Sequence, residues 1–158
     1  MDFKVKELER LMRSFKWARN NSLLIFEEAQ LKSLLEYKPT NDPKHGLLYQ
    51  FQCLLTTTDK YYRQLLHHDN QQFGIIIHDG AIINKAAIPE DDIAALLKKQ
   101  IFGLESLLKD FDSEEFGANI QTIQSIINHE YLHQGQLVVM FRENQADLPE
   151  RFQKAFDL

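Results

Sequence analysis

The sequence predicts an all-α fold, a four-helix bundle. Four long stretches carry apolar residues at spacings of three and four, interleaved with charged residues, and no internal repeat is present. The chain has 158 residues, of which 44% are hydrophobic, enough for one domain with an ordinary core. We therefore expect residues 1–158 to form a single helical-bundle domain, with a short β-hairpin or extended segment between the second and third helices.

The first half of the chain is expected to hold two long helices. Helical spacing of apolar residues predicts the first helix over residues 3–30, and "LKSLLEY" (31–37) is predicted to add a short helix. The segment "KPTNDPKHG" then marks a loop, because Pro, Asn, Asp and Gly favour turns. The second long helix is predicted over residues 46–69, although its three consecutive threonines lower helix propensity slightly.

The second half begins with a change of pattern. In "FGIIIHDGAIIN" (73–84), two β-branched runs flank an Asp-Gly pair, which favours a tight hairpin turn. A third helix is predicted over residues 89–111, which open with Pro and three acidic residues suited to a helix N-terminus. A fourth helix is predicted over 114–144, followed by a loop with Pro149 and a short terminal helix.

Charge and composition exclude several classes of partner. The formal charge is −5 and the 18 basic residues are scattered, whereas a nucleic-acid-binding surface usually shows clustered Lys and Arg. No apolar run reaches the roughly 18 residues of a membrane-spanning helix, and "MDFKVKELER" does not resemble a signal peptide. We expect a cytoplasmic protein that binds neither nucleic acid nor membrane. The single cysteine, Cys53, fits a reducing compartment.

The segment "NHEYLHQGQ" (128–136) contains the pattern His129-Glu130-x-x-His133, the H-E-x-x-H motif of zinc proteases. Two histidines four residues apart lie on one face of a helix, where both can reach one ion. The alternative is a pair of hydrogen-bonded core or surface histidines. A pair at this spacing within an apolar stripe favours metal binding, because burying two unliganded imidazoles is costly.

The rest of the chain disfavours a protease. Val139 occupies one usual position of the third protease ligand and cannot coordinate a metal. Glu143 is too close on the same helix, and Glu150 lies in a short tail. A protease also needs an extended edge strand to bind substrate, and only 73–84 is strand-like. We therefore expect Glu130 to be a solvated or second-shell carboxylate.

Three motifs carry a resemblance to a known family. The segments "CLLTTTDKYYRQL", "HEYLHQGQLVVMFRE" and "LPERF" together resemble the DinB and YfiT-like superfamily of metal-dependent four-helix-bundle proteins, and the resemblance covers most of the chain. In that family a histidine on the second helix joins an H-x-x-x-H pair on the last long helix to hold one divalent metal. The pair matches His129 and His133, whereas Cys53 stands at the family's histidine position; a slip of one residue would place Gln52 or Leu54 there.

The resemblance implies a metal site formed by Cys53, His129 and His133. A Cys-His-His set leaves a fourth position open to water or substrate, and a thiolate favours zinc over harder ions. Nickel and iron are the other metals considered. The alternative is a site that has lost its metal, with Cys53 as a small core residue.

The resemblance also implies a class of reaction. Relatives in the superfamily include thiol transferases, a thiol-dependent isomerase and amide hydrolases. We expect a metal-dependent enzyme that performs thiol transfer or hydrolysis on a small electrophilic substrate, with a low-molecular-weight thiol as one candidate partner. Glu130 and Gln136 are candidates for second-shell roles, and no general base is assigned. The alternative is a non-catalytic, metal-binding or metal-free, stress or interaction bundle. Small bundles of this kind often pair, so we expect a homodimer.

The remaining histidines are expected to be structural or solvated. His67 and His68 close the second helix, whose C-terminal end favours cations. His45 and His78 fall in a loop and beside a tight turn, from which either can fold over the open end of the bundle.

Overall fold

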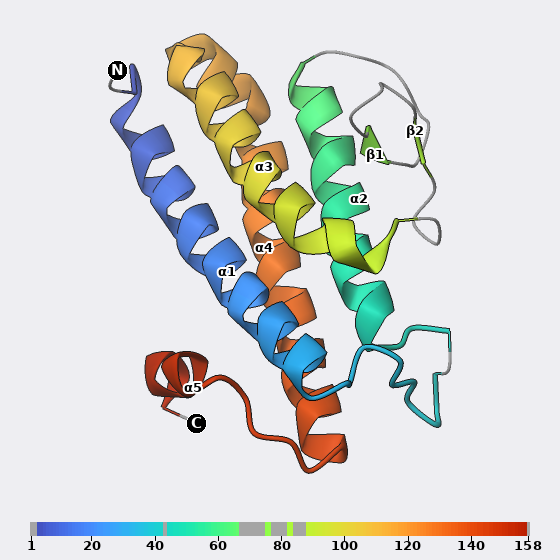
Figure 1. The fold of residues 1–158 in the computed structure, drawn as a ribbon. Helices are drawn as coiled ribbons and strands as arrows, with labels where there is room; N and C mark the ends of the chain where they lie inside the picture. Colours follow the sequence, from blue (N-terminus) through green and yellow to red (C-terminus); the bar gives the residue numbers. More distant parts are fainter. Residues whose placement is uncertain (1–2, 43, 67–74, 77–81, 84–87, 158) are drawn as a thin grey trace.

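The computed structural model describes residues 3–42, 44–66, 75–76, 82–83 and 88–157 and shows a helical bundle (Figure 1). The helices in these described ranges are α1 (Lys6–Leu31), α2 (Leu47–Leu65), α3 (Glu90–Asp110), α4 (Ser113–Glu143) and α5 (Glu150–Phe156). Among them, no helix combines the length and apolar character needed to cross a bilayer. The four long helices lie where the apolar spacing predicts them.

Each of the four long helices packs against two others. Both α1 and α2 pack mainly against α3 and α4, and the short α5 contacts α1 (Figure 1). The contact between α2 and α4 is the one that matters for function, because the predicted metal ligands lie on these two helices.

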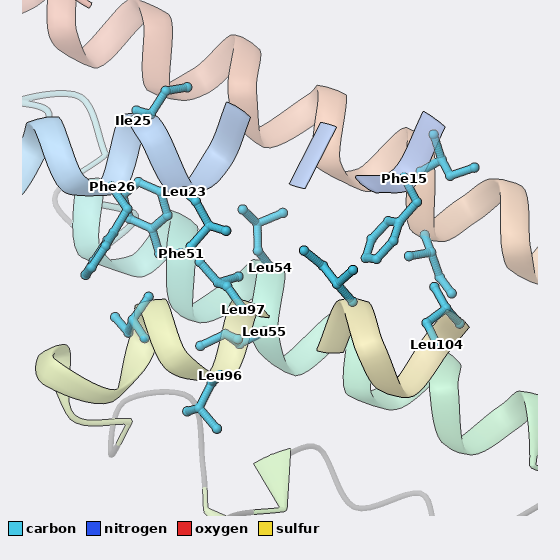
Figure 2. Packing of buried hydrophobic residues seen from close by; sticks show 14 of the residues in the cluster. Phe15, Leu23, Ile25, Phe26, Phe51, Leu54, Leu55, Leu96, Leu97 and Leu104 are labelled. Atoms are coloured by element: carbon cyan, nitrogen blue, oxygen red, sulfur yellow. The ribbon is translucent and has the colours of Figure 1, made fainter. Parts of the chain in front are cut away.

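The core is built from the apolar stripes of the long helices. Phe15 and Phe26 of α1, Phe51 of α2 and Leu97 of α3 all point into the space between the helices (Figure 2). The rings of Phe26 and Phe51 meet edge to face with centroids 5.0 Å apart, an arrangement that adds about 0.5–1.5 kcal/mol to the burial of the two side chains. Each stripe therefore faces the interior as its spacing of three and four predicts.

The predicted short helix over 31–37 is wrong. The helix α1 ends at Leu31, and Ser33 adopts a left-handed conformation with φ of 55°. The backbone N–H of Leu34 donates to Ala29 O at 2.8 Å and that of Ser33 donates to Gln30 O at 3.0 Å. These bonds form a Schellman motif, which satisfies the last carbonyls of α1 and turns the chain away from the helix axis.

The strand-like segment forms a short antiparallel pair. Strand β1 (Ile75–Ile76) pairs with β2 (Ile82–Ile83), with Ile75 opposite Ile83. The Asp-Gly turn predicted between the strands lies outside the described residues, so the hairpin as a whole stays a prediction. Figure 1 shows the pair beside α2, away from the α1 side of the bundle.

A capping box fixes the start of α4. The Asp112 carboxylate accepts hydrogen bonds from the backbone N–H groups of Glu114 and Glu115, both at 2.9 Å. The Glu115 carboxylate in turn accepts from the Asp112 backbone N–H at 2.8 Å. Three amide groups that the helix itself leaves unpaired are thus satisfied at the helix that carries both histidines.

Removing this cap has a defined expected effect. Asp112→Ala should lower the free energy of unfolding by about 1 kcal/mol, which corresponds to a fall in Tm of about 2–4 °C for a chain of this size. Thermal unfolding followed by circular dichroism measures it, with Asp112→Asn as the matched control because asparagine caps nearly as well. Equal Tm values for the alanine variant and the unchanged protein would contradict the assignment of the cap.

Candidate metal centre

Helices α2 and α4 bring the three predicted ligands together. The Cys53 Sγ lies 3.8 Å from His129 Nε2, and this nitrogen lies 3.0 Å from His133 Nε2. The donor atoms of all three residues lie within 4.8 Å of one another. The structure thus gathers the residues that the motifs single out.

The local structure explains this grouping. His129 and His133 are one turn apart on α4, with ring centroids 4.3 Å apart and the rings edge to face. On α2, Gln52 instead reaches toward Ile88 O, and Leu54 is fully buried in the core. Cys53 is therefore the residue of this stretch that faces the histidines, because consecutive helical positions point about 100° apart.

The distances and the donor types fit a divalent metal, zinc in particular. With Zn–N bonds of about 2.0–2.1 Å and a Zn–S bond of about 2.3 Å, tetrahedral geometry sets the two nitrogens about 3.3 Å apart and nitrogen and sulfur about 3.6 Å apart. The corresponding distances here are 3.0 Å and 3.8 Å. Small rotations of the side chains close these differences. A thiolate with two imidazoles is also a donor set that zinc accepts readily.

A pocket gives access to this group. Its volume is about 310 Å³, at the lower end of the range for small-molecule sites. Cys53 and His133 form part of its wall. The other lining residues are Pro39, Asp42, His45, Tyr49, Gln50, Gln136 and Met140. A small molecule in this pocket would meet the ligand group directly.

Gln136 and Glu130, the two candidates for contacts with the metal ligands, lie in different places. Gln136 is exposed and lines the pocket. Glu130 is fully buried and forms an ion pair with Arg19 of α1, while Ser22 Oγ donates a hydrogen bond to the Glu130 carboxylate at 2.8 Å. The solvated alternative for Glu130 is therefore wrong. Glu130 is buried because α4 packs against α2 with the face that carries the histidines and against α1 with the face that carries Glu130.

The ion pair belongs to a buried polar network. The Arg19 guanidinium donates to Gln100 Oε1 at 2.8 Å and to Thr58 Oγ1 at 2.7 Å. Gln134, next to His133, donates to Ala18 O at 2.6 Å. Burial lowers the pKa of Arg19, and the Glu130 carboxylate opposes that shift. All four long helices contribute a side chain, so the network fixes how α4 sits on its neighbours.

Sequence reasoning missed this network. The available signal was Arg19 itself, a charged residue four positions after Phe15 and three before Ser22, all three of which are buried on α1. A long charged side chain at a core position needs a buried partner of opposite charge. Glu130 was an available partner, because it is the acidic residue of the H-E-x-x-H pattern and was not needed as a metal ligand.

His45 lines the pocket. This agrees with the alternative in which the loop carrying His45 folds over the end of the bundle. Its Nδ1 is 2.5 Å from Asp42 Oδ2, and its ring meets the Tyr49 ring edge to face with centroids 4.6 Å apart. These contacts hold the loop that precedes α2 over the pocket, whose wall includes all three residues. His67, His68 and His78 lie outside the described residues.

Comparisons with protein-family models, with curated proteins and with solved structures found no match to this chain. The resemblance to the DinB and YfiT-like superfamily therefore stays an expectation that depends on the quoted motifs. The grouping of Cys53, His129 and His133 beside a pocket is the observation from which function is inferred.

Proposed function

We propose that this chain is a metal-dependent enzyme in which Cys53, His129 and His133 hold one divalent ion, zinc by preference. The proposed reaction is thiol transfer to a small electrophile or hydrolysis of one. The observation that carries the proposal is a set of three donor atoms, within 4.8 Å of one another, from two helices that also border a pocket. Three protein ligands with an accessible fourth position are typical of catalytic rather than structural zinc sites.

The pocket supports a substrate of a particular kind. A bound zinc ion would supply Lewis acidity and lower the pKa of a water or thiol beside it. Besides the ligands, the ionisable lining groups are Asp42, His45 and Tyr49, and the first two pair with each other. Gln136 offers an amide donor and acceptor, and Met140 offers apolar contact. This wall suits a small, uncharged electrophile better than a phosphate or a carboxylate.

The resemblance supports the finer architecture and the assembly. A DinB-like four-helix arrangement would place the ligands on the second and the last long helix, which correspond here to α2 and α4. Leu132 and Val139, seven positions apart on α4, are both exposed. Pairing of two copies would cover apolar side chains of this kind, which supports the proposed homodimer.

One observation favours the alternative of a bundle without turnover. The two histidine Nε2 atoms, 3.0 Å apart, are at hydrogen-bonding distance, so the pair satisfies part of its own polar requirement with no ion. A metal-free interaction protein would need no more than this. Metal content and turnover therefore have to be measured on the same preparation.

A substrate panel tests the proposal. Zinc-loaded protein is assayed with a halogenated nitrobenzene and several low-molecular-weight thiols, and with ester and amide substrates. We expect turnover on at least one class that a chelator abolishes, that added zinc restores and that Cys53→Ala reduces to background. Glu9→Ala is the matched control, because Glu9 lies in an exposed pair with Arg13 and belongs neither to the three-donor group nor to the pocket wall. Stoichiometric zinc without metal-dependent turnover would favour the non-catalytic bundle. No stoichiometric metal, with Cys53 freely alkylated, would reject the site.

A further inference from the structure

Gln50 links a predicted metal ligand to the loop that precedes α2. The side chain is only 2% exposed and makes one contact at each end of its amide. Its Oε1 lies 2.6 Å from His133 Nδ1, and its Nε2 donates to the backbone carbonyl of His45 at 2.9 Å. The sequence-based prediction overlooked Gln50, although it precedes Cys53 by three residues on the same face of α2.

The contact with the His45 carbonyl fixes the orientation of the Gln50 amide. A carbonyl oxygen only accepts hydrogen bonds, so the amide nitrogen has to face His45. The amide oxygen then has to face His133 Nδ1, as the distances of 2.9 Å and 2.6 Å place it. An amide flipped by 180° would lose the hydrogen bond to the His45 carbonyl and turn its own oxygen toward that carbonyl inside a buried site, at a cost of about 1–3 kcal/mol for the group left unsatisfied.

An acceptor at Nδ1 determines where His133 carries its proton. A neutral imidazole holds one proton, and Gln50 Oε1 can only accept, so this proton lies on Nδ1. The lone pair of His133 is then on Nε2, which is the nitrogen that lies within the three-donor group. Metal-binding histidines usually have their other ring nitrogen fixed in this manner by an acceptor.

The same reasoning gives His129 the opposite tautomer. His129 Nε2 lies 3.0 Å from His133 Nε2, which carries the lone pair of that ring. In the metal-free protein His129 Nε2 therefore carries a proton and donates it to His133 Nε2. Coordination by a neutral His129 through Nε2 requires that this proton move to Nδ1. The two ligands therefore differ: His133 is already set for a metal, and His129 has to change.

We infer that Gln50 is a positioning residue that holds His133 in its metal-binding tautomer and couples this ring to the loop over the pocket. Its consequence for metal affinity rests on the proposed function, whereas its effect on the tautomer does not. The carbonyl of His45 keeps the Gln50 amide oriented, and the amide keeps the Nε2 lone pair of His133 directed at the site.

Nitrogen NMR of the histidine rings tests this inference. We use ¹⁵N-labelled protein, metal-free and zinc-loaded, about two units above the ordinary histidine pKa so that neutral rings prevail. His129→Gln assigns the resonances. We expect His133 to carry its proton on Nδ1 in both states and His129 to change from an Nε2 to an Nδ1 proton when zinc binds.

Three variants make the test specific. Gln50→Leu should give a mixture of His133 tautomers and weaken zinc binding about 10- to 100-fold. Gln50→Glu keeps an acceptor for Nδ1 but cannot donate to the His45 carbonyl, so it should retain the tautomer and a zinc affinity at or above that of the unchanged protein. Gln64→Leu is the matched control, the same replacement at an exposed position of α2 that does not line this pocket, and it should alter neither the tautomer nor the zinc affinity.

The outcomes separate the inference from the proposed function. A His133 proton on Nε2 in the unchanged metal-free protein overturns the inference, as does an unaltered His133 tautomer in Gln50→Leu. If the unchanged protein binds no zinc, the proposed function fails, and the tautomers of the metal-free protein still decide the role of Gln50.

Discussion

Glu130→Ala is expected to lower the free energy of unfolding by about 3–5 kcal/mol, and hence the Tm by roughly 6–20 °C. Glu130 and Arg19 are both fully buried and form an ion pair. Removing the carboxylate leaves the Arg19 guanidinium with its positive charge in the core, where Glu130 is its only acidic partner among the residues that the structure describes. Ser22 loses the closer of its two acceptors, at 2.8 Å, and keeps the Ala18 carbonyl at 3.4 Å.

Urea denaturation followed by far-ultraviolet circular dichroism measures this change. Glu9→Ala is the matched control: it removes one partner of an exposed ion pair on α1, and we expect a change below about 0.5 kcal/mol. In the double variant Arg19→Met/Glu130→Leu, apolar side chains replace both charges, so most of the lost stability should return. A loss below about 1 kcal/mol in Glu130→Ala would contradict the structural role of the pair.

Urea denaturation of a second variant, Glu130→Gln, separates the structural role of Glu130 from the role of a general base in a protease. A general base on a metal-bound water would make Glu130→Gln inactive with little change in stability. In the present structure the carboxylate charge itself compensates Arg19, so Glu130→Gln should also lose stability, because the isosteric amide carries no charge. The H-E-x-x-H pattern thus combines residues of two faces of α4, the histidines toward α2 and the glutamate toward α1.

His133→Ala is expected to weaken zinc binding by about 100- to 1000-fold. Protein zinc sites with four ligands bind with about 10–16 kcal/mol, so one ligand corresponds to roughly 2.5–4 kcal/mol, or about two to three decades in affinity. His133 is 4% exposed, and water would have to occupy a buried position to replace it. Competition with a chromophoric chelator measures the affinity.

A pocket histidine provides the control for this prediction. His45→Ala removes an imidazole from the same pocket that is not one of the three gathered donors and keeps the backbone carbonyl that Gln50 contacts, so its zinc affinity should fall by less than about tenfold. Zinc at 100 times Kd should also stabilise the unchanged protein by about 2.7 kcal/mol, and should leave the stability of His133→Ala almost unaltered. Equal affinities for His133→Ala and His45→Ala would exclude His133 as a ligand.

Local periodicity accounts for what the sequence predicted well. The spacing of apolar residues located the four long helices to within a few residues, and the four-residue spacing placed His129 and His133 on one face. The additional short helix over 31–37 was predicted wrongly because the apolar spacing there suggests a helix, whereas the Schellman motif at Ser33 turns the chain away after α1. Hydrogen bonds formed after the last turn decide a helix end, and they leave little trace in the apolar pattern.

Contacts between helices account for what was missed. Gln50 meets His133, and Arg19 meets Glu130, across 83 and more than 100 positions of sequence respectively. Neither pairing has a fixed spacing, because each depends on how α4 packs against α2 and α1. Cys53 was predicted as a ligand from its position in the segment "CLLTTTDKYYRQL", which resembles the superfamily. The structure then showed that Cys53, and not Gln52 or Leu54, faces the two histidines.

The central claim is that the Cys53 thiolate joins His129 and His133 around one metal ion, and the absorption spectrum of the cobalt-substituted protein tests it most directly. Cobalt(II) occupies zinc sites, and a thiolate ligand gives it a sulfur-to-metal charge-transfer band in the near ultraviolet. We expect this band to saturate at one cobalt ion per chain, to disappear in Cys53→Ser and to be lost at the same cobalt concentration in His133→Ala. Absence of saturable binding, or a band that persists unchanged in Cys53→Ser, would contradict the claim.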